Sequence, residues 1–311
     1  MMNPIIQTKR LTRYFDRQAV VRDLDLSVPP GQVTALLGLN GAGKTTTIRI
    51  IMGLLRPTRG SCQIFGKDSS ELSPDDRMRI GYMVEGHFLY SRMSVRECAR
   101  FQGAGYSRWN DTQFDRIVKH FGISQSTRVG HLSRGQRAGV SLALVLAPDP
   151  ELLVLDDPAL GLDPVSRRAL NETLVEFAAD GQRTVLLSSH LLDDVERIAD
   201  RVMLMIDGRL QVDTTLDDFR RRVAGFAVEV DVVDSDRVAA IPGLIEARRL
   251  GPRLHLTVAD ADEETSAAIE RLQATAVEPI ELPFSDSVLA WLSRSRNQHS
   301  FLGRHHAGES T

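Results

Sequence analysis

The clearest pattern along the chain is a short apolar run followed by apolar residues at helical spacing. Residues 33–37, VTALL, are β-prone and lie between Gly31 and Gly38, which is typical of a strand buried in a parallel sheet. After Lys44, apolar residues recur every three or four positions and predict a helix: Ile48, Ile51, Met52 and Leu55. A second apolar run, ELLVLD, predicts another buried strand ending at Asp156. The pattern predicts an α/β fold.

The pattern changes twice further along the chain. Residues 87–130 are predicted to be mostly helical, with apolar positions at Phe114, Ile117, Val118 and Phe121. Beyond residue 222, FAVEVDV and RLHLTVA alternate with period two, VEPIELP predicts a third strand, and EETSAAIERLQATA and FSDSVLAWL predict helices. We therefore expect a large domain over 1–222 with a helical subdomain at about 87–140. A small α/β domain over 223–292 and a polar, disordered tail over 293–311 complete the expected organisation.

Composition narrows the class of protein. With 42% hydrophobic and 25% charged residues, the 311-residue chain is ordinary for a globular protein. A net charge of −3 gives no reason to expect nucleic-acid binding. Two cysteines fit a reducing compartment. No apolar stretch reaches the roughly 18 residues of a membrane span, and no signal peptide is recognisable, so we expect a cytoplasmic protein.

The strongest motif is a phosphate-binding loop. Residues 38–45 satisfy the pattern G-x-x-x-x-G-K-[ST], and they lie between the predicted strand and helix. Glycines let backbone N–H groups converge on phosphate oxygens, and the start of the helix adds partial positive charge. Lys44 is expected to reach the β- and γ-phosphates, and Thr45 to bind Mg²⁺. The expected phosphate contacts are Gly38, Leu39, Asn40, Gly41, Ala42, Gly43, Lys44, Thr45 and Thr46.

Later motifs indicate which nucleotide-binding family this is. No asparagine is followed by lysine, which argues against a guanine-specific site. Instead RIGYMVE, LSRGQ, LLVLDDP, GLDP and TVLLSSH follow one another in that order. Over roughly residues 5–220 the chain therefore resembles the ATP-binding cassette (ABC) ATPases. The expected fold is α/β, a P-loop ATPase domain with a mixed-sheet core and a helical subdomain, followed by the small C-terminal α/β appendage.

The resemblance implies roles for the acidic and histidine residues. Asp156 would hold Mg²⁺, and Asp157 stands where the family's general base polarises the attacking water. His190 matches the histidine that contacts the γ-phosphate, and Asp163 matches the aspartate that communicates across a dimer. Glu85 stands at the family position whose side chain contacts both Mg²⁺ and the attacking water, and its carboxylate would bind Mg²⁺.

Other implied roles involve a second cassette and the adenine ring. Ser133, Arg134, Gly135 and Gln136 form the signature, which closes over the ATP of the other subunit. Ser133 is also expected to cap the helix that follows it. Phe15, or its neighbour Tyr14, would stack on adenine. The competing interpretation places Phe15 in the hydrophobic core.

Three positions depart from the commonest family pattern. Glu85 replaces a glutamine, and Arg134 replaces the first glycine of the signature. Asp157 replaces a glutamate and is one methylene shorter. Because a misplacement of about 1 Å can cost on the order of 10²-fold in rate, we expect slow but real ATP hydrolysis.

The resemblance implies an ATP-hydrolysing subunit that powers transport, in the direction of export, through a separate transmembrane permease. It would lie on the inner face of the membrane and work with a second cassette, identical or different. The helical subdomain would receive a coupling helix of the permease. A regulatory cassette that binds ATP with little hydrolysis is the main alternative. A non-transport ATPase acting on DNA or ribosomes is disfavoured by the short interval before the signature.

Overall fold

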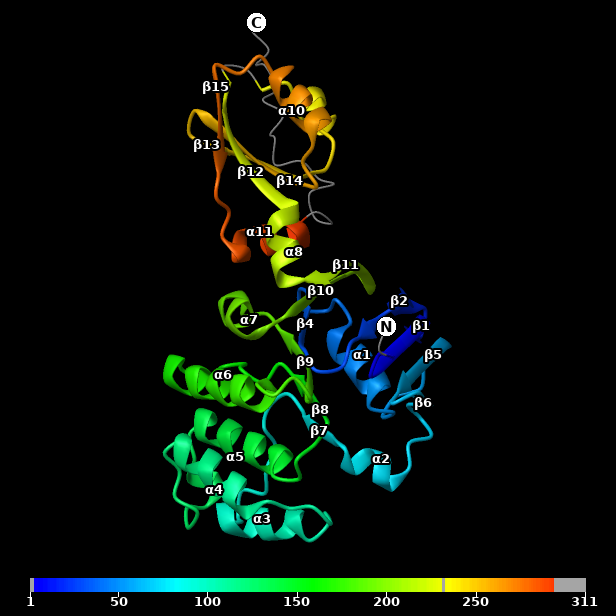
Figure 1. Cartoon of the computed structure of the whole chain (residues 1–311), viewed down its shortest axis with the longest axis vertical. Coiled ribbons are helices and arrows are strands. Elements are labelled where there is room, and N and C mark those ends of the chain that lie inside the picture. The colour runs from blue at the N-terminus through cyan, green and yellow to red at the C-terminus, as the bar shows by residue number, and fades with distance from the viewer. Residues whose placement is uncertain (1–2, 231–232, 294–311) are drawn as a thin grey trace, which may run out of the picture. The chain divides into compact units, whose positions relative to one another are not determined.

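The computed structural model describes residues 3–230 and 233–293. The chain forms two compact units, Met1–Leu216 and Asp217–Thr311 (Figure 1). The division falls before the expected boundary at residue 222, because Phe219 packs edge-on against Phe284 at a centroid distance of 5.6 Å. The tail predicted to be disordered, 293–311, lies outside the described residues apart from Ser293.

The first unit is built on a six-stranded sheet with the order β11-β10-β4-β9-β8-β7. All its neighbouring pairs are parallel except β10 and β11. Every residue of β4 is buried, as the apolar run VTALL predicted. The strands are β4 (Val33–Leu37), β7 (Ile80–Met83), β8 (Leu152–Asp156), β9 (Thr184–Ser189), β10 (Arg201–Ile206) and β11 (Arg209–Thr215).

A second, antiparallel sheet covers helix α1 (Lys44–Ile51) from the other side, and its apolar residues share one core with α1 and the central sheet. Its strands are β1 (Ile6–Phe15), β2 (Gln18–Leu24), β3 (Ser27–Val28), β5 (Arg59–Ile64) and β6 (Lys67–Asp68). Helix α1 is shorter than predicted. It ends before Met52 and Leu55 because Gly53 adopts a left-handed conformation, with φ of +68°, that no helix continues through.

Helices α3, α4 and α5 gather at one end of the first unit (Figure 1). The predicted helical residues Phe114, Ile117 and Val118 are buried on α4. Residues 87–94 are irregular, so the helices begin later than expected, at the capping box of Ser94. The helices of this unit are α2 (Pro74–Met78), α3 (Val95–Gly103), α4 (Asp111–His120), η1 (Val129–His131), α5 (Arg134–Leu146), α6 (Pro164–Ala178) and α7 (Leu192–Ile198).

The second unit is a four-stranded antiparallel sheet with the order β13-β14-β12-β15, and its β-α-β-β-α-β sequence is ferredoxin-like. Strand β13 and helix α9 were not predicted. A register shift between Leu244 and Glu246 interrupts the alternation that would have revealed β13. The elements are β12 (Val223–Glu229), α9 (Ser235–Ala239), β13 (Leu244–Leu250), β14 (Arg253–Ala259), α10 (Glu263–Glu270), β15 (Ala276–Ile280) and α11 (Phe284–Ser293), preceded by α8 (Leu216–Arg222).

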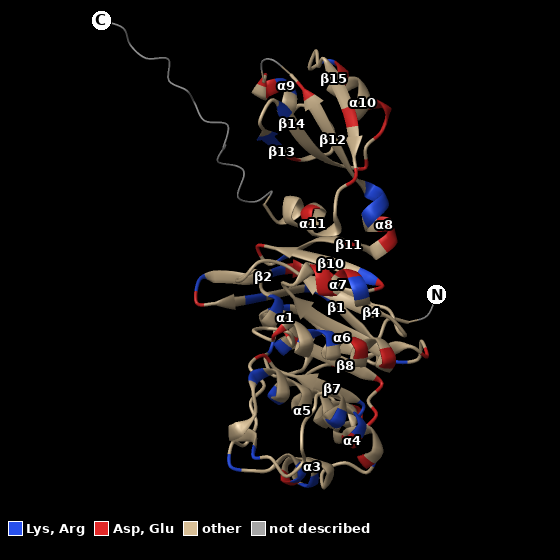
Figure 2. Cartoon of the chain, turned by 90° about the vertical axis from the view of Figure 1, so that its left-hand side faces the viewer, with Lys and Arg blue, Asp and Glu red and all other residues tan. Residues whose placement is uncertain are grey.

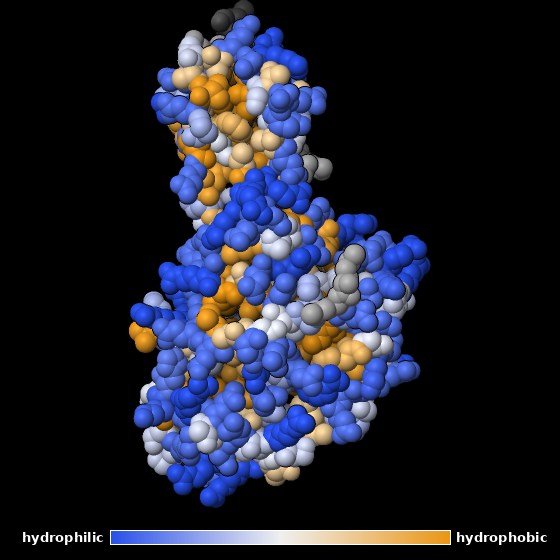
Figure 3. Space-filling model, in the orientation of Figure 1, coloured by the Kyte–Doolittle hydropathy of each residue, from blue (hydrophilic) through white to orange (hydrophobic). Residues whose placement is uncertain are grey.

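Surface properties agree with the composition. Basic and acidic side chains are intermixed along the helices, and α8 begins acidic and ends basic (Figure 2). Figure 3 shows a mostly hydrophilic face on which apolar side chains appear between polar ones. Among the described residues, no helix is both long and apolar enough to cross a membrane.

Candidate functional site

The phosphate-loop motif occupies the turn between β4 and α1. Gly41 and Gly43 have φ of +85° and +101°, conformations that disfavour other residues. A Cβ atom at Gly43 would also lie 2.7 Å from the Val20 carbonyl oxygen. Lys44 begins α1, and its Nζ donates hydrogen bonds to the carbonyls of Gly38 (2.7 Å) and Leu39 (3.2 Å). The loop therefore curls around the lysine ammonium.

Asp156 lies beside this loop because β8 and β4 are parallel to their common neighbour β9 and end at the same edge. Thr45 Oγ1 donates to Asp156 Oδ1 at 3.1 Å. Asp156 is buried, and its other neighbour is the hydroxyl of Ser188. A threonine hydroxyl and a carboxylate are oxygen donors of the kind that Mg²⁺ prefers.

Asp157 and His190 form a second pair at this edge. Asp157 Oδ2 lies 2.8 Å from His190 Nδ1. Asp157 Oδ1 is buried and has no hydrogen-bond partner among the described residues. The Asp157 backbone is left-handed, with φ of +46°. One oxygen is thus held by histidine, while the other is free to accept a proton or hydrogen bond.

Burial shifts the pKa values of the central charged groups. Burial lowers the pKa of Lys44, while the negative charges of Asp157, Asp156 and Glu85 oppose that shift. Burial raises the pKa of Asp157, with His190 and Lys44 acting in the opposite direction. Both shifts follow from removing a charged group from water, and the neighbouring opposite charges offset that effect only in part.

Ser188 is the residue of this cluster that the sequence analysis missed. Its Oγ donates to Asp156 Oδ1 at 2.9 Å and accepts the backbone N–H of Asp157 at the same distance. It is fully buried near the end of β9, opposite Asp156. The available signal was a polar residue interrupting the apolar run TVLL before His190.

Two other predicted groups lie at the margin of the cluster. Glu85 is exposed in the loop after β7, and its charge opposes the lowering of the Lys44 pKa, but no hydrogen bond among the described residues ties it to the cluster. Phe15 and Tyr14 are 44% and 37% exposed, so the interpretation of Phe15 as a core residue is wrong. The Arg13 guanidinium lies 4.8 Å from the centre of the Phe15 ring.

The signature and the GLDP loop contact each other instead. Ser133 caps α5, as expected, in a capping box with Gln136. Asp163 caps α6 and accepts a hydrogen bond from the Ser166 hydroxyl. A Cβ atom at Gly135 would lie 1.9 Å from Ser166 Oγ, which explains the glycine. No hydrogen bond joins either loop to Lys44 or Asp156 within the described part of the chain.

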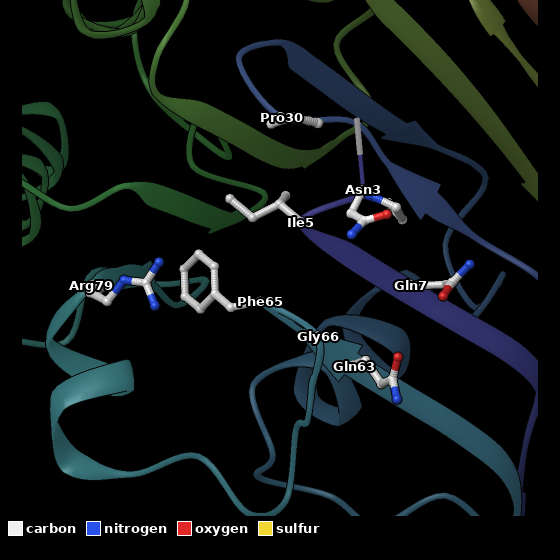
Figure 4. Close-up of a pocket in the computed structure, with 9 residues that line it drawn as sticks. Asn3, Ile5, Gln7, Pro30, Gln63, Phe65, Gly66 and Arg79 are labelled. Atoms are coloured by element: carbon white, nitrogen blue, oxygen red, sulfur yellow. The ribbon is translucent and has the colours of Figure 1, made fainter. Parts of the chain in front are cut away.

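A separate hollow of about 490 Å³ lies away from these residues, between β1, the β5–β6 hairpin and Arg79 (Figure 4). The Arg79 guanidinium stacks over Phe65 at 3.8 Å from the ring centre. Its charge is already paired with Glu151 and Asp76. This hollow contains none of the predicted site residues.

Comparison with known proteins identifies the family. Residues 21–160 match the ABC transporter family. The bacitracin transport ATP-binding protein BcrA of Bacillus licheniformis is 32% identical over 223 residues, which cover 71% of this chain and 73% of that protein. The Nod factor export ATP-binding protein I of Cupriavidus metallidurans is 33% identical over 213 residues, covering 67% and 70%.

A solved structure agrees. The structure of an ATP-binding subunit of an ABC transporter has 32% sequence identity and a TM-score of 0.63, and the match covers 70% of this chain and 92% of that one. The order of motifs, the folded core and these relatives all point the same way. The chain belongs to the ATP-binding subunits of ABC transporters.

Proposed function

We propose that this chain hydrolyses ATP at the cluster around Lys44 and couples the cycle to export through a separate membrane subunit. The observation that carries the proposal is the convergence of Lys44, Asp156 and the Asp157–His190 pair. They meet at one edge of the central sheet although they are far apart in sequence. This is where P-loop proteins bind the phosphates of a nucleotide.

Each group has a chemical role in the proposal. The loop N–H groups from Gly38 to Thr46 and the Lys44 ammonium bind the phosphates. Asp157 Oδ1, which has no hydrogen-bond partner among the described residues, accepts a hydrogen bond from the attacking water, while His190 fixes Oδ2 and contacts the γ-phosphate. The raised pKa of Asp157 makes the carboxylate a stronger base at neutral pH. Phe15 or Tyr14 stacks on adenine.

Thr45 and Asp156 would hold Mg²⁺, with Glu85 nearby. The 3.1 Å contact between Thr45 Oγ1 and Asp156 Oδ1 brings two oxygen donors together beside the phosphate loop, so these residues fit the ion. When bound, Mg²⁺ would neutralise charge that develops on the phosphate oxygens. Ser188 keeps Asp156 in place by donating to the same carboxylate oxygen.

The shortened base sets the expected rate. Aspartate is one methylene shorter than glutamate, and its contact with His190 holds one of its two carboxylate oxygens. We therefore propose turnover below that of a glutamate-containing site by up to about 10²-fold. A regulatory cassette with little hydrolysis remains the second candidate, because the same His190 contact occupies half of the carboxylate.

The partners follow from the signature and from the relatives. Ser133, Arg134, Gly135 and Gln136, with Asp163 beside them, make no hydrogen bond to the chain's own Lys44 or Asp156, which fits action on the nucleotide of a second cassette. Export is proposed because one relative is named a Nod factor export protein and another a bacitracin transport protein. The membrane subunit would dock on the helical subdomain beside the loop that follows β7.

The test is steady-state ATPase activity of the purified chain with Mg²⁺, compared with Lys44→Ala and Asp157→Glu. We expect measurable wild-type turnover and none in Lys44→Ala. Asp157→Glu should remain active, with turnover equal to wild type or higher by up to about 10²-fold. If the wild type matches Lys44→Ala and Asp157→Glu gains activity, the chain is instead a regulatory cassette whose partner performs hydrolysis.

A further inference from the structure

A small cavity lies between the loop after β7 and the start of α5. It shares Arg134 with the signature, but its lining includes no residue of the phosphate loop and neither Asp156, Asp157 nor His190. It has a volume of about 290 Å³. Its walls include His87, Phe88 and Ser91 from the loop, and Arg134 and Arg137 from α5. The feature is specific to this chain in one respect, since Arg134 stands where the resembled family has glycine.

The lining of this cavity is basic and uncompensated. None of its lining residues is acidic, and neither Arg134 nor Arg137 forms an ion pair with a described residue. Arg79 in the other hollow provides a contrast, because Glu151 and Asp76 already neutralise it. Two guanidinium groups at one cavity attract an anion, and carboxylates match guanidinium geometry.

His87 supplies the observation that points to a ligand. It is 3% exposed, and no well-aligned hydrogen bond reaches either ring nitrogen within the described part of the chain, although the Pro158 carbonyl lies close enough to raise its pKa. Buried polar groups are nearly always hydrogen-bonded, so such a residue requires an explanation. Burial, followed by the charges of Arg134 and Arg137, lowers its pKa to about 4, with the Pro158 carbonyl acting in the opposite direction. The neutral ring carries one N–H donor.

The rim of the cavity indicates what kind of molecule brings the anion. Phe88 lines the cavity and is 83% exposed. Close by in sequence, Tyr90 is also exposed and meets the exposed Phe101 edge-on at a centroid distance of 5.7 Å. Exposed aromatic residues together with arginine are typical of the energetic centre of a protein–protein interface. A free inorganic ion would not use these aromatic residues.

We propose that the cavity receives the carboxylate of one aspartate or glutamate from the membrane subunit, paired with Arg134 and Arg137 and hydrogen-bonded by His87. This proposal rests on the membrane partner of the proposed function and adds the chemistry by which that partner is recognised. The proposed contact would also connect the membrane subunit to the nucleotide site, because Arg134 belongs to both the cavity and the signature. The Arg134 guanidinium lies against Gly161, where an added Cβ would be 2.4 Å from Nη1, so the occupant would fix the signature relative to the GLDP loop.

The experiment measures the affinity of the full-length chain for its membrane subunit in lipid nanodiscs. Arg137→Glu should weaken binding by at least about thirtyfold, because it removes a charge partner and adds a repulsive one. Arg137→Lys keeps the charge and should lose much less. Arg168→Glu, on α6, changes an arginine that is already exposed and should bind as wild type. Lysine substitution of one acidic residue in the cytosolic segments of the membrane subunit should restore binding to Arg137→Glu.

Two results would overturn the proposal: Arg137→Glu binding as tightly as wild type, or no acid-to-lysine substitution restoring it. If isolated Arg137→Glu keeps wild-type ATPase activity, either result contradicts the cavity proposal and leaves the proposed function standing. The proposed function fails only if the wild-type chain itself shows no ATPase activity. A second arm needs no membrane subunit. His87 ring ¹⁵N resonances of the full chain should shift saturably with acetate and not with acetamide. No shift, or tighter binding of inorganic phosphate than of acetate, would contradict a carboxylate site.

Discussion

Ser188→Ala should disable the site without removing any acid, base or phosphate ligand. The Ser188 hydroxyl donates to Asp156 and accepts from the Asp157 backbone, with both contacts at 2.9 Å. One hydroxyl therefore holds two consecutive carboxylate residues in position. Without it, the buried Asp157 N–H and one Asp156 lone pair lose their partner.

The magnitude follows from these two contacts. Leaving a buried donor unsatisfied costs about 1–3 kcal/mol of stability. If the two carboxylates relax by about 1 Å, turnover falls on the order of 10²-fold, which corresponds to about 2.7 kcal/mol of transition-state stabilisation. We expect both effects, measured by urea unfolding and by phosphate release at saturating MgATP.

Ser189→Ala is the matched control. Ser189 is the next residue of β9 and is also buried, but among the described residues its hydroxyl accepts only the backbone N–H of Leu191. It should lose similar stability and keep turnover within about threefold of wild type. Equal turnover in Ser188→Ala and wild type, or equal slowing in both alanine variants, would refute the idea that Ser188 positions the carboxylates.

Three further predictions concern other parts of the first unit. Gly135→Ala places a Cβ 1.9 Å from Ser166 Oγ, so we expect ATP-dependent dimerisation, followed by size-exclusion chromatography, to weaken at least about tenfold. Asp157→Asn should lower turnover by about 10²–10⁴-fold. It should also raise the free energy of unfolding at pH 7, because the raised pKa of Asp157 means that folding disfavours its ionised carboxyl. Equal or lower stability of the variant in urea unfolding would contradict this. Hydrogen bonds from Lys67 and Ser73 lower the pKa of Asp76 to about 2, so its stabilisation is present above its ordinary pKa of 3.8 and is lost as pH falls through about 2. Asp76→Asn should therefore be less stable than wild type at pH 7, and the gap in urea unfolding should narrow below about pH 4 and close towards pH 2.

Patterns that depend on neighbouring residues were predictable from the sequence. Strand β4 and most of helix α1 follow from apolar runs and spacing, and the glycine pattern gave the phosphate loop between them. Local turn chemistry was less visible. Gly53 ends α1 early, and the capping box at Ser94 starts α3 after an irregular stretch that apolar content alone had suggested was helical.

Long-range features were predictable only where a family motif supplied them. Nothing local in LIEARRL marks β13, because its pairing with β14 shifts register at Glu246. Similarly, the two roles of the Ser188 hydroxyl depend on β8 lying beside β9, a pairing of residues about thirty positions apart. The cavity at His87 was also invisible, because its walls come from a loop and a helix separated by some forty residues.

Asp157, which departs from the family pattern by one methylene, is also the residue at which the fold combines several energetically unfavourable features. Asp157 combines a left-handed backbone, a raised pKa and a buried oxygen without a partner. A strained non-glycine backbone costs of order 1–3 kcal/mol, and aspartate tolerates this conformation better than longer side chains do. Ser188 and His190 hold the residue there by its backbone N–H and its Oδ2. A site selected only for binding ATP gains nothing from such a cost, so this arrangement favours a working base over a degraded one.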